Sequence, residues 1–182
     1  MIGLKKFSAA TSLLALLVFC GAAAAQETFS DAFAGFGSNS NEPIEIEAKD
    51  LEVRDKEKSA IFSGNVVVVQ GTSKLKSNRL VVYYSGSLEG GEGPQQSISR
   101  LEASGDVLIS ADDQIATGDN ASFDMEKEFM VMTGKKVVLS QGDNVIVGKK
   151  ITVNLKSGKV NMDASKSGRV KLLLQPNSMK KN

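Results

Sequence analysis

Residues 43–48 read Pro43-Ile44-Glu45-Ile46-Glu47-Ala48, a strict alternation of apolar and acidic side chains. Successive side chains of a β-strand point to opposite faces, so this pattern predicts a strand with one buried face. Short apolar runs of the same kind recur about every 8–12 residues, separated by sequences that favour turns. Because no apolar stripe of helical length interrupts the series, the sequence predicts an all-β fold with hairpin connections.

The predicted elements follow directly from this reading. The predicted strands are residues 44–48, 60–62, 66–69, 80–84, 107–109, 130–132, 137–139, 145–147, 151–155 and 170–174, and the predicted turns are residues 55–58, 70–72, 112–113, 141–144 and 157–159. The long glycine-rich interruption at residues 85–96 predicts a mobile surface loop.

A weak internal repeat supports the same fold class. Ser63-Gly64-Asn65-Val66, Ser104-Gly105-Asp106-Val107 and Thr133-Gly134-Lys135-Lys136-Val137 each open a β-rich stretch of similar plan. A unit of two hairpins cannot bury an apolar face alone, so we expect the units to stack into one core.

The first 25 residues are typical of a secretory signal peptide. Lys5 and Lys6 precede an uncharged apolar run over residues 7–25 that ends in four alanines. We expect cleavage near Ala25 and export from the cytoplasm. The alternatives are an uncleaved membrane anchor, because the run approaches the length of a membrane span, and a lipoprotein modified at Cys20, which the bulky Phe19 disfavours.

The remaining chain divides into three further segments. Residues 26–42 are rich in Ser, Asn, Gly and Ala and predict a flexible lead-in, although phenylalanines are spaced among them. Residues 43–176 carry the predicted strands and form one domain. Residues 177–182 are a polar tail.

Composition excludes several classes of function. The chain of 182 residues contains no histidine and one cysteine, which excludes Ser-His and Cys-His catalytic pairs, His-metal sites and intrachain disulfides. Its 22 basic residues balance 21 acidic ones, so charge gives no reason to expect nucleic acid as a partner.

Carboxylates are the remaining candidates for chemistry. Asp112 with Asp113 would make an acid/base pair, and Asp119 with Asp143 would join a calcium cluster. Adjacent strand residues face opposite ways, however, and Asp is favoured in turns for its backbone tolerance. We therefore interpret these residues as turn residues and predict no catalytic site, no metal and no cofactor.

The predicted interior is aliphatic and short of large side chains. Tryptophan is absent, and the aromatics of residues 43–182 are Phe62, Tyr83, Tyr84, Phe123 and Phe129. Either the sheets pack closely on aliphatic side chains, or they splay and leave an apolar groove that a lipid can occupy. Composition alone favours close packing.

Six segments of the chain resemble a known family in the same order. They are residues 43–48, 62–71, 76–82, 123–129 with 133–134, 148–152 and 169–176, with motifs such as Phe62-Ser63-Gly64-Asn65-Val66 and Arg169-Val170-Lys171-Leu172-Leu173-Leu174. Over residues 42–178 the chain resembles the OstA-like family of periplasmic lipopolysaccharide-transport proteins, which includes LptA.

The resemblance implies a fold, a function and partners. The fold is an open antiparallel β-jellyroll of about sixteen strands in two V-shaped sheets that enclose an apolar groove. The function is non-enzymatic carriage of lipopolysaccharide across the periplasm, with the acyl chains of lipid A shielded in the groove. Copies stack head to tail and dock on LptC-like inner-membrane and LptD-like outer-membrane proteins. The alternatives are an LptC-like membrane-anchored docking component and a structural β-filament protein.

Alternation within each strand predicts the side chains that line the groove. The predicted inward set is Ile44, Ile46, Val66, Val68, Leu80, Val82, Val107, Ile109, Phe123, Met125, Val137, Leu139, Ile151 and Val153. By the resemblance, Ile44, Phe123 and Met125 match positions that contact lipid, Val107 falls near another, and Ser40 matches a polar residue at the groove entrance.

Two further surfaces are predicted. The first and last strands, which contain Pro43, Ile44, Glu45 and Ile46 at one end and Lys171, Leu172, Leu173 and Leu174 at the other, would leave unpaired edges for end-to-end assembly. Five basic residues either meet lipid A phosphates or form an ordinary solvated face; they are Lys74, Lys76, Arg79, Lys149 and Lys150.

Overall fold

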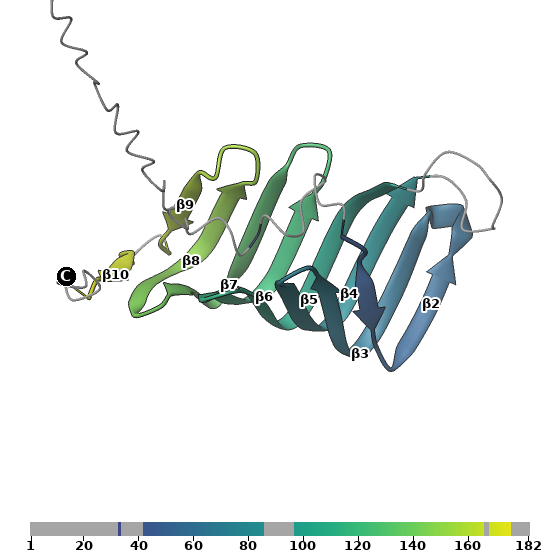
Figure 1. The fold of residues 1–182 in the computed structure, drawn as a ribbon, viewed down its shortest axis with the longest axis horizontal. Coiled ribbons are helices and arrows are strands. Elements are labelled where there is room, and N and C mark those ends of the chain that lie inside the picture. Colours follow the sequence, from purple (N-terminus) through teal and green to yellow (C-terminus); the bar gives the residue numbers. More distant parts are fainter. Residues whose placement is uncertain (1–32, 34–41, 86–96, 166–167, 176–182) are drawn as a thin grey trace, which may run out of the picture.

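The computed structural model describes Phe33 and residues 42–85, 97–165 and 168–175. Within these residues the chain forms ten strands and one short 3-10 helix, which confirms the predicted all-β class. The elements are β1 (Glu45–Glu47), β2 (Asp50–Arg54), η1 (Asp55–Glu57), β3 (Ser59–Gln70), β4 (Ser73–Ser85), β5 (Ser97–Ala111), β6 (Gln114–Asp124), β7 (Phe129–Gln141), β8 (Asn144–Asn154), β9 (Val160–Asp163) and β10 (Lys171–Leu173). They lie side by side along the length of the molecule (Figure 1).

All ten strands belong to one antiparallel sheet that does not close on itself. The order is β1-β3-β4-β5-β6-β7-β8-β10, with β2 also paired to β3 and β9 also paired to β8. β2 and β3 therefore form one end of the molecule, and β9 and β10 lie at the other (Figure 1). The predicted strand runs include no counterpart of β2, β6 or β9.

A row of irregularities crosses the long strands near their middle. The pairing register shifts between Ser63 and Val66 of β3, and equivalent shifts interrupt every later pair up to β7 and β8. Gly64 and Gly105 have φ of 81° and 79° there, and Asn65 and Asp106 follow with 50° and 48°. Gly and Asn or Asp tolerate this left-handed backbone best, so the repeated motifs of the sequence mark the bulges.

The bulges divide the sheet into two parts, which we call the first and second wings. The first wing consists of β1, β10 and residues 66–70, 73–77, 107–111, 114–118, 137–141 and 144–148. The second wing consists of β2, β9 and residues 59–63, 79–85, 97–104, 120–124, 129–133 and 150–154. Side chains from one face of both wings form a single buried cluster, so the sheet folds along the bulges and the wings face each other.

The expected sixteen strands in two sheets are corrected to ten strands in one sheet within the described residues. The long strands β3 to β8 continue through the bulges, so each one contributes a segment to both wings. Alternation in sequence reports local strand character, and it does not show whether two runs belong to one continuous strand.

Several sequence predictions fall outside the described residues. These are the signal peptide at 1–25, the glycine-rich loop from residue 86 to 96, and the tail at 177–182. The lead-in also lies outside, except for Phe33 and Glu42, and so does Ser40, the polar residue predicted at the groove entrance. Among the described residues, no helix has the length and apolarity needed to span a membrane.

Candidate functional site

The inward side chains of the first wing form a continuous apolar row. Each strand contributes one residue, and each residue is paired in register with the next. The row is Ile46, Val68, Leu75, Ile109, Ala116, Leu139, Ile146 and Leu172. It runs from β1 at one edge of the sheet to β10 at the other.

The second wing carries two such rows. The row nearer the bulges is Leu51, Phe62, Leu80, Ala103, Ala121, Met132, Ile151 and Met162. The row farther from them is Val53, Ala60, Val82, Leu101, Phe123, Met130, Val153 and Val160. Both run from β2 to β9.

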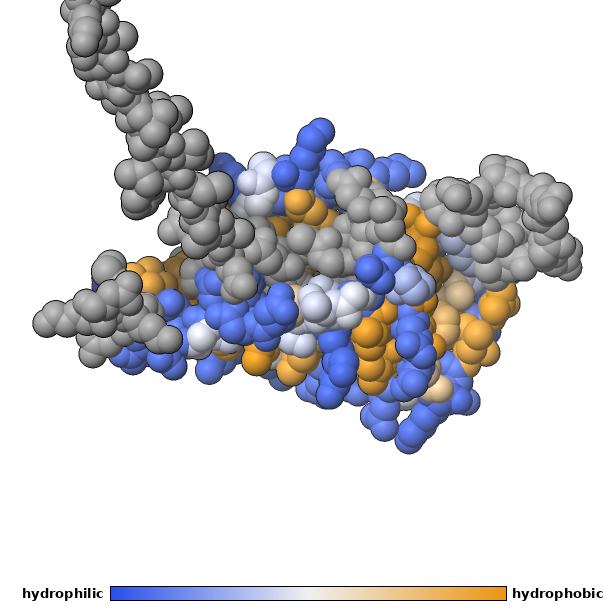
Figure 2. Space-filling view, viewed as in Figure 1, coloured by the Kyte–Doolittle hydropathy of each residue, from blue (hydrophilic) through white to orange (hydrophobic). Residues whose placement is uncertain are grey.

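No polar side chain interrupts these three rows between one edge strand and the other. Three of their six terminal members are exposed at the sheet edges, with Leu51 58% exposed, Val53 49% and Leu172 57%; the other three are half-buried. Hydrophobic surface is visible at the β2–β3 end (Figure 2). We call this apolar interior between the wings the trough, and its lining reaches both ends of the molecule.

The middle of the trough is closely packed. Leu139 and Ile109 of the first wing and Phe123 and Met130 of the second are 0% exposed. Phe33 is also 0% exposed and belongs to the same cluster. A guest chain would enter this interior by displacing packed side chains or by separating the wings.

All the side chains predicted to face inward lie in this cluster or against it. Ile44 and Ile46 pack against it at the β1 edge and are partly exposed, and the other members of the predicted set are buried. Their contact with a lipid stays a prediction.

The sequence reading missed several members of the cluster. Among them are Leu75, Leu101, Met130, Met132 and the alanines of the rows. Leu75 had a usable signal, since Ser73-Lys74-Leu75-Lys76-Ser77 alternates strictly. Alanine and isolated leucine give weak apolar runs, so a search for runs passes over them.

The free rim of the first wing, where its hairpin turns lie, is lined by polar side chains. We call this rim the first lip and the corresponding rim of the second wing the second lip. Gln70 and Gln114 on the first lip are only 4% and 2% exposed. The Nε2 of Gln70 donates a hydrogen bond to the carbonyl oxygen of Glu42 at 3.0 Å, and Asn144 Oδ1 accepts one from the Gln175 N–H at 3.2 Å.

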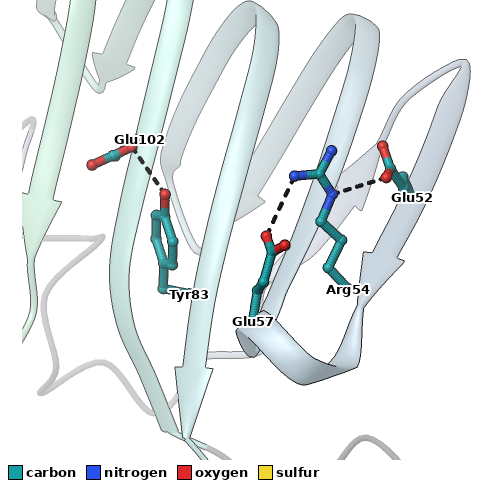
Figure 3. Close-up of polar contacts among 5 residues, drawn as sticks. All are labelled: Glu52, Arg54, Glu57, Tyr83 and Glu102. Atoms are coloured by element: carbon teal, nitrogen blue, oxygen red, sulfur yellow. Dashed lines mark hydrogen bonds and ion pairs between the residues drawn. The ribbon is translucent and has the colours of Figure 1, made fainter.

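The outward faces carry ordinary surface interactions. Arg54 of β2 contacts Glu52 at 2.8 Å and Glu57 at 3.3 Å (Figure 3). Its guanidinium holds the pKa of Glu52 below the usual range, chiefly through this hydrogen bond. The Tyr83 hydroxyl lies 3.4 Å from Glu102 (Figure 3), and Arg100 lies 4.5 Å from the centre of the Tyr83 ring.

A basic cavity of about 310 Å³ opens on the outside of the first wing beside β10. Five cations line it and no carboxylate does; the cations are Lys135, Lys136, Lys149, Arg169 and Lys171. None of them forms an ion pair with another described residue. The structure thus separates the predicted basic residues: Lys149 lines this cavity, whereas Lys76 and Arg79 line others that also contain Asp106 or Glu102.

The carboxylates considered for catalysis occupy structural positions. Asp112 sits in a hairpin turn with φ of 49°, and Asp119 Oδ2 accepts a hydrogen bond from the Lys135 N–H at 2.7 Å. Among the described residues, no three acidic, histidine or cysteine side chains group as metal ligands would.

Known proteins are similar to this chain in sequence. The family model described as "LptA/(LptD N-terminal domain) LPS transport protein" matches residues 45–159. An uncharacterized protein of Rhizobium meliloti (strain 1021) is 39% identical over 98% of this chain and 96% of its own length. The lipopolysaccharide export system protein LptA of Escherichia coli (strain K12) is 29% identical over 81% of this chain and 78% of its own.

A solved structure also matches. It is LptH of Pseudomonas aeruginosa, the LptA-homologous periplasmic component of the lipopolysaccharide transport device. The two structures share a TM-score of 0.60 and 22% identity over 76% of this chain and 99% of that one. This likeness supports the fold.

Proposed function

The chain belongs to the LptA/LptD N-terminal domain family of LPS transport proteins, and on that premise we propose that it is a periplasmic carrier of lipopolysaccharide. In this role the apolar trough shields the acyl chains of lipid A, while the sugars and phosphates stay in water. The carrier needs no catalytic group.

The observation that carries the proposal is the continuity of the three apolar rows from edge to edge. Each methylene kept out of water is worth about 0.8 kcal/mol, so several acyl chains could not cross an aqueous compartment uncovered. Aliphatic walls cover them without any directional bond that would hold a chain at one place. The lining therefore suits both shielding and sliding.

The open ends support head-to-tail stacking of copies. Along the described path from β1 to β10, each strand runs antiparallel to the next, and the path holds eight strands. An even number places β1 and β10 in opposite directions. A second copy displaced along the molecule can then add its β1 antiparallel to β10, and the apolar rows continue across the joint.

Charge supports the same joint. Glu45 and Glu47 alternate with the inward Ile44 and Ile46, so they face outward on β1. Lys171 faces outward on β10 and lines the basic cavity with four further cations. Addition of a second β1 would bring its glutamates to this cavity.

The remaining parts of the proposal concern export and docking. Residues 1–25 direct export and are removed, and residues 43–176 form the carrier domain. The β1–β2 end receives cargo from an LptC-like inner-membrane protein, and the β9–β10 end delivers it to an LptD-like outer-membrane protein. These ends are the exposed, half-paired edges of the sheet.

A structural filament without cargo is the second candidate, because the interior is closely packed and the edges are exposed. Photo-crosslinking separates the two. We expect a photoreactive phenylalanine analogue at position 123, which faces the trough, to label lipopolysaccharide in cells. The control places the same analogue at Val131, on the outward face of the same wing, where we expect less labelling. Equal labelling from both positions, or none from 123 in a folded protein, would contradict the carrier function.

A further inference from the structure

Two buried side-chain atoms of the described residues have no hydrogen-bond partner: Gln70 Oε1 and Tyr84 Oη. Their side chains are more than nine-tenths buried, with Gln70 4% and Tyr84 7% exposed. Gln70 ends β3 on the first lip, and Tyr84 lies near the end of β4 on the second lip. The two residues thus lie beside opposite lips, one on each wing, and both atoms are buried.

The orientation of the Gln70 amide is fixed. Its Nε2 donates to the Glu42 carbonyl oxygen at 3.0 Å, so the nitrogen is engaged and Oε1 is left as a bare acceptor. Gln70 continues the inward series of Val66 and Val68 along β3. An apolar residue at this position would extend the trough lining and remove the bare acceptor, at the loss of the hydrogen bond to the Glu42 carbonyl oxygen.

Tyr84 presents a comparable group on the other lip. Its ring belongs to the buried cluster, and its backbone N–H donates to the Lys58 carbonyl oxygen at 3.0 Å. The neighbouring Tyr83 faces outward, where its hydroxyl reaches Glu102. Phenylalanine at position 84 would therefore keep the buried ring and lose no hydrogen bond of the side chain.

A buried polar group without a partner destabilises a fold. Two such groups, one beside each lip of the trough, point to a ligand that satisfies them. Gln70 Oε1 requires a donor, and Tyr84 Oη can both donate and accept. An acyl chain that enters methyl end first brings its carboxyl-proximal groups level with the lips.

We propose that the two lips form a hydrogen-bonding site for the polar groups at the head of a hydroxyacyl chain, namely its β-hydroxyl and its amide N–H. The site rests on the carrier function and adds selectivity to it. The apolar rows hold any acyl chain, and the lips favour chains that carry a donor near the carboxyl carbon.

The test compares β-hydroxymyristate with myristate, which differ by one hydroxyl, by displacement of a fluorescent fatty acid from the full mature chain. We expect wild-type protein to bind β-hydroxymyristate about three- to tenfold more tightly. The Tyr84→Phe/Gln70→Leu double variant should bind the two acids equally. Tyr84→Phe alone should leave the melting temperature unchanged or raised, because it removes an unpaired buried hydroxyl.

Tyr83→Phe is the matched control and should retain the preference for the hydroxy acid. Equal binding of the two acids by wild-type protein, or an unchanged preference in the double variant, overturns the lip site while the carrier function stands. Wild-type protein that binds neither acid overturns both.

Discussion

The two wings face each other across one trough, yet they are built from different side chains. The inward face of the first wing consists of valine, leucine, isoleucine and small residues, and it ends in a lip of buried amides. The second wing holds all the methionines and inward aromatic rings of the described strands and their connections. They are Phe62, Tyr84, Phe123, Met125, Met130, Met132 and Met162.

This difference suggests different parts in one task. Methionine has three rotatable bonds and a polarizable sulfur, so it adapts to guests of varying shape. Branched aliphatic side chains on strands have few rotamers and keep a fixed surface. We infer that the first wing acts as a rigid wall and that the second wing adjusts to the acyl chain proposed to lie between them.

The wings also differ in charge. All five ion pairs between described residues lie on the second wing or on η1 beside it. The first wing instead carries Glu45 and Glu47 on its first strand and the basic cavity beside its last strand. Ion pairing between described residues is thus confined to the second wing and η1, whereas Glu45, Glu47 and the cations of the cavity are left for another molecule.

The comparison requires that the inward faces of both wings be apolar. The largest expected effect on stability comes from placing a charge on either face. Leu139→Asp in the first wing and Met130→Asp in the second place a carboxylate at positions that are 0% exposed. We expect each to lower the free energy of unfolding by several kcal/mol, which is comparable to the whole stability of a small domain. Urea denaturation measures the loss.

The controls are the next residues along each strand. Val138→Asp and Val131→Asp face outward and should cost much less. If the outward variants were as damaging as the inward ones, the assignment of faces would be wrong.

The second prediction concerns the separated charges of the first wing. Lys171→Glu should weaken self-association by about tenfold or more, because it reverses a cation of the cavity that would receive Glu45 and Glu47. Sedimentation over a range of concentrations measures the change. Asp163→Lys on β9, at the same end of the second wing, should have a smaller effect. Rescue of Lys171→Glu by Glu45→Lys would sharpen the assignment, and unchanged association of Lys171→Glu would contradict it.

Much of the wing structure could be predicted from the sequence, because alternation reports directly which side chains share a face. The inward set from Val66 to Val153 is buried as expected. The repeated Ser-Gly-Asn-Val motif also marked real features, since Gly64 and Asn65 form a bulge. The edge strand β2 alternates too, but three of its five residues are charged, so a search for apolar runs does not detect it.

The difference between the wings could not be predicted in this way. The composition of each wing depends on where the bulges divide the long strands. The register of the folded sheet shows these positions. The buried amides were missed for a similar reason. Gln70 precedes Gly71 in a predicted turn, where a polar residue is ordinary and gives no sign of burial.

The third prediction tests whether the methionines make the second wing more adaptable than the first. The double substitution Met130→Leu/Met132→Leu conserves volume and should cost less than about 1.5 kcal/mol of stability per site. It should narrow the range of chain lengths that bind well, changing the affinity ratio of myristate to a longer fatty acid by about threefold. Probe displacement measures this ratio. Leu75→Met/Leu139→Met in the first wing is the matched variant, and equal effects of the two pairs would refute the division of roles.

The smallest effect is expected from an ion pair on the second wing, at the turn between β6 and β7. Lys127 donates to Asp124 from both its Nζ and its backbone N–H, each at 2.9 Å, and these bonds hold the pKa of Asp124 below its usual range.

A lowered folded-state pKa adds stability that is present above the unfolded value of about 3.9 and is lost as pH falls through the folded value. Asp124→Asn should therefore lower the melting temperature slightly at pH 7, and the difference from wild type should vanish in acid. The pair is exposed, so salt should also reduce the difference. Asp112→Asn is the matched variant, in a turn of the first wing where the aspartate forms no ion pair with a described residue, and it should lower the melting temperature less at pH 7. If Asp112→Asn lost stability with the same pH profile, charge would contribute equally to both wings, and the contrast between internally paired and outwardly directed charge would fail.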